Sequence, residues 1–290
     1  MKYNLVAIVI IGITFFSCDF RKSVHKNLQT GLTTKGDGLS CSDVYLSDGN
    51  NKITETNHIY GQKFFINFEN IEGFTNVNGR VYPEMDLYVI NEKGDTALQQ
   101  TDMYASLTNG TDISPLLLNC NIVVGNPIHS NENYTAHVKI YDQKGDGTFI
   151  ATLDFSVVPN GQINIESEKL SCQEIYLFSG ERSTAIVDNK ATFNEHIYLL
   201  FEGMEGVETL DGKCQIGLSI LARDNSGAVI INEGDLFSGQ EFSLEEIKTQ
   251  IAPNIIINEG ALSNPVYLEV NIWDKRGEGK IKSWVKLIIE

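Results

Sequence analysis

The stretch "AHVKIYDQKGDGTFIATLDFSVV" (136–158) has the pattern of a β-hairpin with one buried face. Apolar residues alternate with mostly polar ones before and after "DQKGDG" (142–147). Period-two alternation on both sides of a glycine-containing connection is typical of two antiparallel strands. The glycines give the backbone the freedom that a tight connection needs. We therefore predict a hairpin that turns at 142–147.

A second copy of this hairpin ends the chain. "LEVNIWDKRGEGKIKSWVKLIIE" (268–290) aligns with 136–158, and four other blocks recur in the same order. They are "LSCSDVYLSDG" (39–49) with "LSCQEIYLFSG" (170–180), "FENIEGF" (68–74) with "FEGMEGV" (201–207), "NGR" (78–80) with "DGK" (211–213), and Asp102-Met103-Tyr104 with Asp235-Leu236-Phe237. A period of about 130 residues greatly exceeds that of a solenoid, so each copy should be a domain with its own core.

The fold class follows from the pattern inside each copy. Each contains about seven short alternating or apolar runs separated by turn signals, with almost no helical period. We predict an all-β chain of two tandem antiparallel Ig-like β-sandwich domains, 39–159 and 160–290, that arose by internal duplication. One helix is expected in "SLEEIKTQI" (243–251), where Ser243 and Glu246 have the spacing of a capping box.

The hairpin turn has an alternative interpretation as a calcium loop. Asp142 and Asp146, with their counterparts Asp274 and Glu278, are weak candidates for oxygen ligands. Neither copy has the density of acids or the distal bidentate glutamate of an EF-hand. The tight turn is favoured, and neither a metal nor a cofactor is predicted.

The N-terminus has the pattern of an export signal. Lys2 precedes "LVAIVIIGITFF" (5–16), an apolar stretch too short to span a bilayer comfortably. Residues 1–17 are therefore predicted to be a signal peptide. The residues that follow, up to 38, are mostly polar and predict a flexible tether.

The block "TFFSC" (14–18) resembles the lipobox of bacterial lipoproteins. That resemblance implies cleavage before Cys18 and a diacylglycerol on its thiol, so that 18–38 is a lipidated tether and the bilayer is a partner. Each buried methylene adds ~0.8 kcal/mol, and several acyl chains make anchoring effectively permanent. An ordinary secretory signal, or a signal anchor with an incidental cysteine, is the alternative.

Lipobox, tether and tandem sandwiches together resemble the cell-envelope lipoproteins of the Bacteroidetes, whose extracytoplasmic parts are often Ig-like. The resemblance implies an outer-membrane lipoprotein. Asp95-Thr96-Ala97 also resembles the short O-glycosylation motif of that group. The residues after Cys18, Asp19 to Lys22, are not the acidic cluster often linked there to surface export. Periplasmic and surface-exposed display both stay open.

Charge and cysteine content limit the partners. With 22 basic and 38 acidic residues the formal net charge is −16, which argues against nucleic acid and against docking by charge on an anionic membrane.

Besides Cys18 there are Cys41, Cys120, Cys172 and Cys214. In an exported chain the simplest disulfides are Cys41–Cys120 and Cys172–Cys214, and four buried thiols are the alternative.

No catalytic signature stands out. The chain has no GxSxG, P-loop or HExxH motif, and its five histidines are scattered. Glu69 and Glu72 recur as Glu202 and Glu205 at a strand end, where a structural role in the turn is favoured. A non-enzymatic protein is predicted. The alternative is an envelope glycan or peptidoglycan hydrolase that uses a carboxylate pair.

The second hairpin carries an unusual set of aromatic residues. A register that places Ile272 opposite Ile281 puts Tyr267, Trp273 and Trp284 on the outer face. Large aromatics on an outer face usually have a partner. They would pack on the other domain or a neighbouring chain, or stack on a sugar or an extended partner. The predicted function is a lipid-anchored binding or scaffolding protein of the bacterial envelope, with a glycan or another envelope protein as partner.

Overall fold

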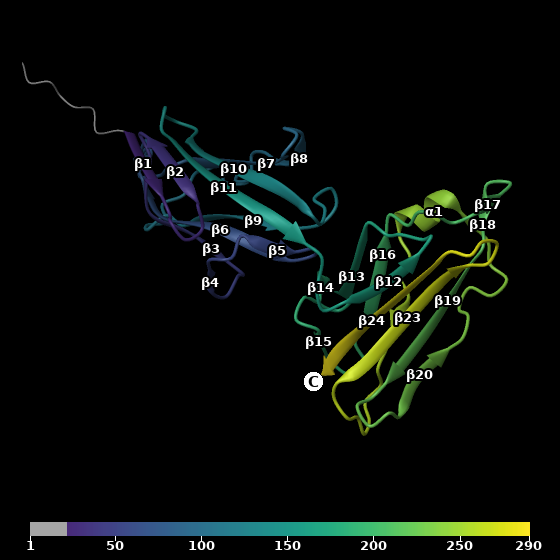
Figure 1. The fold of residues 1–290 in the computed structure, drawn as a ribbon. Coiled ribbons are helices and arrows are strands. Elements are labelled where there is room, and N and C mark those ends of the chain that lie inside the picture. The colour runs from purple at the N-terminus through teal and green to yellow at the C-terminus, as the bar shows by residue number, and fades with distance from the viewer. Residues whose placement is uncertain (1–21) are drawn as a thin grey trace, which may run out of the picture.

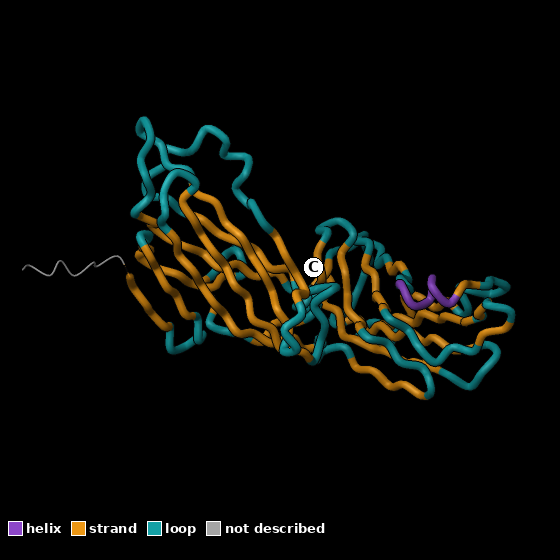
Figure 2. The backbone as a smooth tube through the Cα atoms, turned by 90° about the horizontal axis from the view of Figure 1, so that it is seen from above, coloured by secondary structure: helices purple, strands orange, loops and turns teal. Residues whose placement is uncertain are grey.

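The computed structural model describes residues 22–290, which form an all-β fold with a single short helix in that range. Two β-sandwich halves lie end to end (Figure 1), and the view from above shows the same elongated arrangement (Figure 2). Each half has its own hydrophobic core, one within 32–157 and the other within 163–289. The predicted signal peptide and Cys18 lie outside the described residues.

The N-terminal half packs a seven-stranded sheet on a four-stranded sheet. The larger sheet has the order β1 (Lys22–Lys26), β2 (Thr33–Asp37), β11 (Thr148–Val158), β10 (Glu132–Asp142), β7 (Pro83–Asn91) and β8 (Thr96–Gln100), with β5 (Asn57–Ile59) parallel to β11. The smaller sheet has the order β4 (Lys52–Ile53), β3 (Ser40–Ser47), β6 (Lys63–Glu72) and β9 (Leu118–Val123).

The C-terminal half repeats this arrangement. Its larger sheet has the order β12 (Asn164–Glu168), β24 (Lys280–Ile289), β23 (Val266–Asp274), β19 (Ile216–Arg223) and β20 (Val229–Glu233), with β15 (Lys190–Ala191) parallel to β24. Its smaller sheet has the order β14 (Thr184–Ala185), β13 (Glu174–Ser179), β16 (Ile197–Glu202) and β22 (Asn254–Ile255). A small third sheet joins β17 (Thr209–Leu210), β18 (Lys213–Cys214) and β21 (Phe242–Ser243).

The two halves share one strand order, and the hairpins predicted from the alternating pattern are confirmed. β10 and β11 take the places that β23 and β24 take in the second half, and β3 and β6 correspond to β13 and β16. The alternation of the opening stretch is also confirmed, because Val138, Ala151 and Leu153 are fully buried between the sheets. Each such side chain contributes roughly 1.5–3 kcal/mol by leaving water, except alanine, which contributes less.

The predicted helix is present and the predicted tether is not. Helix α1 (Leu244–Thr249) begins after Ser243, which forms a capping box with Glu246 as expected. Residues 22–37, however, form β1 and β2, and β2 pairs with β11, so a flexible tether over this range is wrong. The hydrophobicity pattern does not reveal β2, because the two buried positions of this strand are Thr34 and Gly36.

Candidate functional site

The two hairpin turns hold neighbouring loops through one buried aspartate each. The Asp142 carboxylate accepts the backbone N–H of Thr75 at 2.7 Å and that of Lys144 at 2.9 Å. Asp274 accepts the equivalent groups of Glu208 and Arg276 at the same two distances. The hairpins themselves form as predicted, and backbone donors occupy these carboxylate oxygens.

The remaining acids of the two turns differ in their surroundings. Asp146 is exposed, and Glu278 forms an ion pair with Lys169. Within 22–290 no three His, Cys, Asp or Glu side chains are grouped so that they could hold a metal ion. The turns therefore serve as loop anchors in both halves.

The four cysteines of the described chain are free thiols, so the predicted disulfides are wrong. Cys41 lies on β3 opposite Ile71 of β6, and Cys120 lies on β9 opposite Ile66 of β6. The two cysteines are two strand spacings apart across the sheet, roughly 9–10 Å, and their partners on β6 are also five residues apart along the strand. Their separation therefore exceeds the reach of a disulfide. Burial raises the pKa of Cys120 and of Cys172 to about 12 and that of Cys41 to about 11, so these thiols stay protonated.

The scattered histidines include one that is fully buried. The His58 imidazole stacks on Phe64 with ring centroids 3.8 Å apart and an interplanar angle of 5°. Neither of its ring nitrogens has a hydrogen-bond partner among the described residues. Burial lowers the pKa of His58 to about 4, so the ring is a neutral part of the core and not a catalytic base.

Tyr267, Trp273 and Trp284 lie on the outer face of β23 and β24, and we call this surface the aromatic face. Ile272 pairs with Ile281, as the predicted register requires. Trp273 pairs with Gly217 of β19, and its indole covers that glycine so closely that a Cβ at position 217 would overlap the ring. Glycine at this strand position is thus explained by the indole above it.

Polar and charged side chains surround these three rings. Lys282 lies 5.7 Å from the centre of the Trp284 ring and forms an ion pair of 2.9 Å with Glu269. The Tyr267 side chain, in a residue 40% exposed, lies beside Lys286 at 5.5 Å. A hollow of about 560 Å³ runs along β12 beside Trp273. It is lined also by Asn271, Glu166, Glu168 and Lys280.

The contacts that join the two halves lie elsewhere, at a junction that the sequence does not reveal. Tyr60 and Tyr176 donate their hydroxyls to the two carboxylate oxygens of Glu202, at 3.0 and 2.7 Å. Ser130 donates its backbone N–H and its hydroxyl to Glu174, at 2.7 and 2.6 Å. Since Tyr60 and Ser130 belong to the N-terminal half, the two carboxylates bind one half to the other. The contacts of the aromatic face given above stay within the C-terminal half.

The two junction carboxylates face each other across β13 and β16. Burial raises the pKa of Glu174, the Ser130 hydrogen bonds oppose this, and the neighbouring Glu202 adds to it. Both acids are hydrogen-bonded between the halves, so they do not form the open carboxylate pair that a glycosidase needs. Their repeat equivalents, Asp43 and Glu69, also pair across two strands, and there Lys52 neutralises Asp43 at 2.8 Å.

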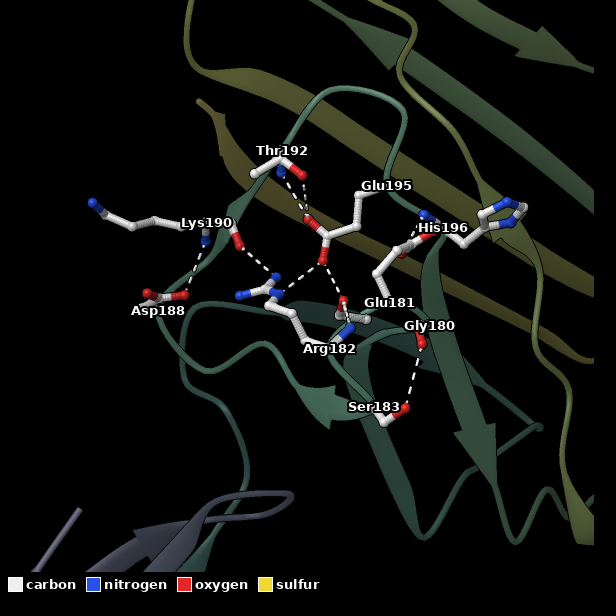
Figure 3. Close-up of polar contacts among 10 residues, drawn as sticks. Gly180, Glu181, Arg182, Ser183, Asp188, Lys190, Thr192, Glu195 and His196 are labelled. Carbon is white, nitrogen blue, oxygen red and sulfur yellow. Dashed lines mark hydrogen bonds and ion pairs between the residues drawn. The ribbon is translucent and has the colours of Figure 1, made fainter. Parts of the chain in front are cut away.

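A second polar network shapes the C-terminal side of the junction (Figure 3). Glu195 is buried and accepts hydrogen bonds from Arg182 Nε at 2.8 Å, from the N–H of Thr192 at 2.7 Å, and from the Ser179 hydroxyl. Burial opposes ionisation, yet these donors together lower the pKa of Glu195. Arg182 also donates to the Lys190 carbonyl at 2.9 Å, so the network fixes the loop that contains β14.

A groove of about 480 Å³ opens beside the Tyr60–Glu202–Tyr176 contact, and we call it the junction groove. It is lined by residues of β8 and β9 in the first half and by residues of β13 and β14 in the second.

Glu72 and Glu205, the other recurrent acids, stay exposed and contact Asn70 and Lys248. Within 22–290 no helix has the length and apolar character needed to cross a membrane.

Comparisons with known proteins give no family. No family model matches the chain, and no curated protein matches it. Dimeric latent PorU from Porphyromonas gingivalis is similar over 87% of this chain and 20% of its own, with 9% identity and a TM-score of 0.26. A calcium-binding mutant of Bacteroides uniformis beta-glucuronidase 2 is similar over 86% of this chain and 32% of its own, with 8% identity and a TM-score of 0.24.

A protein named BspA_C_WT is similar over 84% of this chain and 99% of its own, with 11% identity and a TM-score of 0.23. The chain spans about a fifth of the PorU chain and about a third of the glucuronidase chain. At these TM-scores the similarities carry no argument about fold or function.

Proposed function

We propose that the chain is a non-enzymatic binding or scaffolding protein of the bacterial envelope, anchored through a lipid on Cys18 and built of two Ig-like domains. The aromatic face is its binding surface, and a glycan is its ligand. The envelope assignment rests on the signal and lipobox-like pattern of residues 1–18.

The observation that carries the proposal is the composition of the aromatic face. Trp273 and Trp284 are only half-buried, although the core beneath them is complete without either ring. Asn271, Glu269 and Lys282 place amide, carboxylate and ammonium groups beside the rings. An apolar platform with a few polar groups around it is the usual composition of a small-ligand site, and it suits a sugar ring with its hydroxyls.

A glycan array probed with the purified full chain tests this proposal. Trp273→Ala is expected to abolish the strongest signals, since aromatic residues are frequent binding hot spots. Tyr141→Ala is the matched control, because Tyr141 occupies the equivalent repeat position beside the first turn. Equal glycan signals from wild type and Trp273→Ala would contradict the proposal. If instead another envelope protein binds wild type but not Trp273→Ala, the ligand of the aromatic face is that protein and not a glycan.

A further inference from the structure

Strand β9 presents unpaired backbone groups at the edge of its sheet. It is the last strand of the order β4-β3-β6-β9, so only β6 pairs with it. Val124, just beyond it, directs its N–H to Gln62 and its carbonyl to Gly61, on the β6 side. Because backbone groups alternate along a strand, those of Asn121 and Val123 point away from β6.

Asn119, the next outward-facing residue of β9, shows that the backbone groups of this edge accept a hydrogen-bonding partner. The N–H and the carbonyl of Asn119 both contact the Tyr104 hydroxyl, each at 3.0 Å, so a side chain already caps them. The N–H and C=O groups of Asn121 and Val123 have no such partner within the described chain. Both residues line the junction groove.

The junction groove has the walls that an extended chain requires. Across from β9 lie Leu98 and Gln100 of β8, which is the edge strand of the other sheet, and Thr184 of edge strand β14. Val123 is 51% exposed as a residue and lines this groove, where a neighbouring apolar side chain would cover it. In the second half the equivalent edge strand β22 has only two residues, a common way to blunt an edge.

We propose that the junction groove binds an extended peptide segment of another protein, which adds as a strand to β9. Its main chain exchanges hydrogen bonds with Asn121 and Val123, and alternate side chains cover Val123 and Leu98. An edge with free N–H and C=O groups selects an extended chain over a helix, because a helix satisfies its own backbone groups. Lys63 lines the groove beside Val123, whereas Arg182 is paired with Glu195 and Glu202 is hydrogen-bonded by Tyr60 and Tyr176. Lys63 therefore favours a segment that carries an acidic residue next to the side chain that covers Val123.

Selection of random linear peptides displayed on phage, against the immobilised full chain, tests the proposal. Peptides that bind wild type are expected to lose at least about tenfold in affinity to Val123→Pro, which removes an edge-facing N–H and is tolerated at a sheet edge. Val123→Ala keeps the N–H and is the matched control, with a loss of only a few fold expected. Trp273→Ala should leave this binding unchanged, so the aromatic face and the groove are tested separately.

Hydrogen exchange on the wild type supports the test without any substitution. A bound peptide should slow exchange at the amides of Asn121 and Val123, while that of Ile122, already directed at β6, should change little. The proposal is overturned if no peptide is selected, if the selected peptides bind Val123→Pro as well as wild type, or if exchange at both edge amides stays unchanged.

Discussion

At the residue scale, close contacts explain why particular residue types occur at single positions, which the sequence repeat alone does not explain. Gly217 occurs on β19 because the Trp273 indole lies against it, whereas its first-half equivalent is Glu84, which accepts the N–H of Tyr104 at 2.6 Å. His58 is accommodated in the core only in its neutral form. For each of these two positions, the contact predicts how a substitution changes the free energy of unfolding.

Gly217→Ala is expected to lower the free energy of unfolding by about 1–3 kcal/mol, because the new Cβ must displace the indole of Trp273. The double variant Gly217→Ala, Trp273→Ala should recover most of this loss, since the overlapping ring is gone. Denaturant unfolding of the four proteins of the cycle measures the coupling. Additive losses in the double variant would show that the indole does not press on position 217.

The stability of the wild type should fall as the pH drops from about 6.5 towards 4. His58 has a pKa lowered to about 4 from its ordinary value of 6.5, so the unfolded chain takes up its proton first. His58 thus contributes stability above pH 6.5 that is lost as the pH falls through this window. The unfolding free energy of His58→Phe should vary less between pH 6.5 and 4 than that of wild type. An identical pH profile for both proteins would place His58 in contact with water.

At the element scale, the hairpin turns and the junction show what can be read from a sequence. Alternation over 136–158 and 268–290 predicts both hairpins, their register and the outer position of Trp273. β2 is missed because a threonine and a glycine occupy its buried positions. The junction is missed because Glu202, at the end of β16, contacts Tyr60, which lies 142 residues away in the sequence, and no local pattern encodes such a contact.

Asp142→Ala should destabilise the first half by roughly 1–3 kcal/mol for each backbone N–H left unpaired, those of Thr75 and Lys144. Asp146→Ala, at an exposed position of the same turn, should cost little. Thermal unfolding with and without millimolar calcium completes the test. A melting temperature that rises with calcium in wild type but not in Asp142→Asn would show that the turn binds the ion, since a ligand of the native state stabilises it.

At the scale of the whole molecule, the two sandwiches lie end to end (Figure 1). Glu202 and Glu174 of the second half accept hydrogen bonds from Tyr60 and Ser130 of the first. Such a contact favours a defined angle between the halves. Strand β1 begins at Lys22, the first residue that the structure describes.

Cys18→Ser is expected to move the protein from the membrane fraction to the soluble fraction, or to leave an uncleaved precursor, because the serine cannot carry the thioether lipid. Fractionation of cells that express each form, with metabolic labelling by a fatty acid, measures both outcomes. Cys41→Ser, which changes a free thiol inside the fold, is the matched control and should stay with the membrane. Normal labelling and membrane partition of Cys18→Ser would refute the lipid anchor.

The intrinsic fluorescence of the wild type tests the central claim most directly. Trp273 and Trp284 are the only tryptophans of the chain, so tryptophan emission reports on the aromatic face alone. If a glycan binds there, adding the strongest glycan from the array should change the emission saturably and protect it from acrylamide. The midpoint should agree with the dissociation constant from calorimetry, and Tyr141→Ala should behave as wild type does. A glycan that binds by calorimetry but leaves the emission and its quenching unchanged would contradict the assignment of the aromatic face as the binding surface.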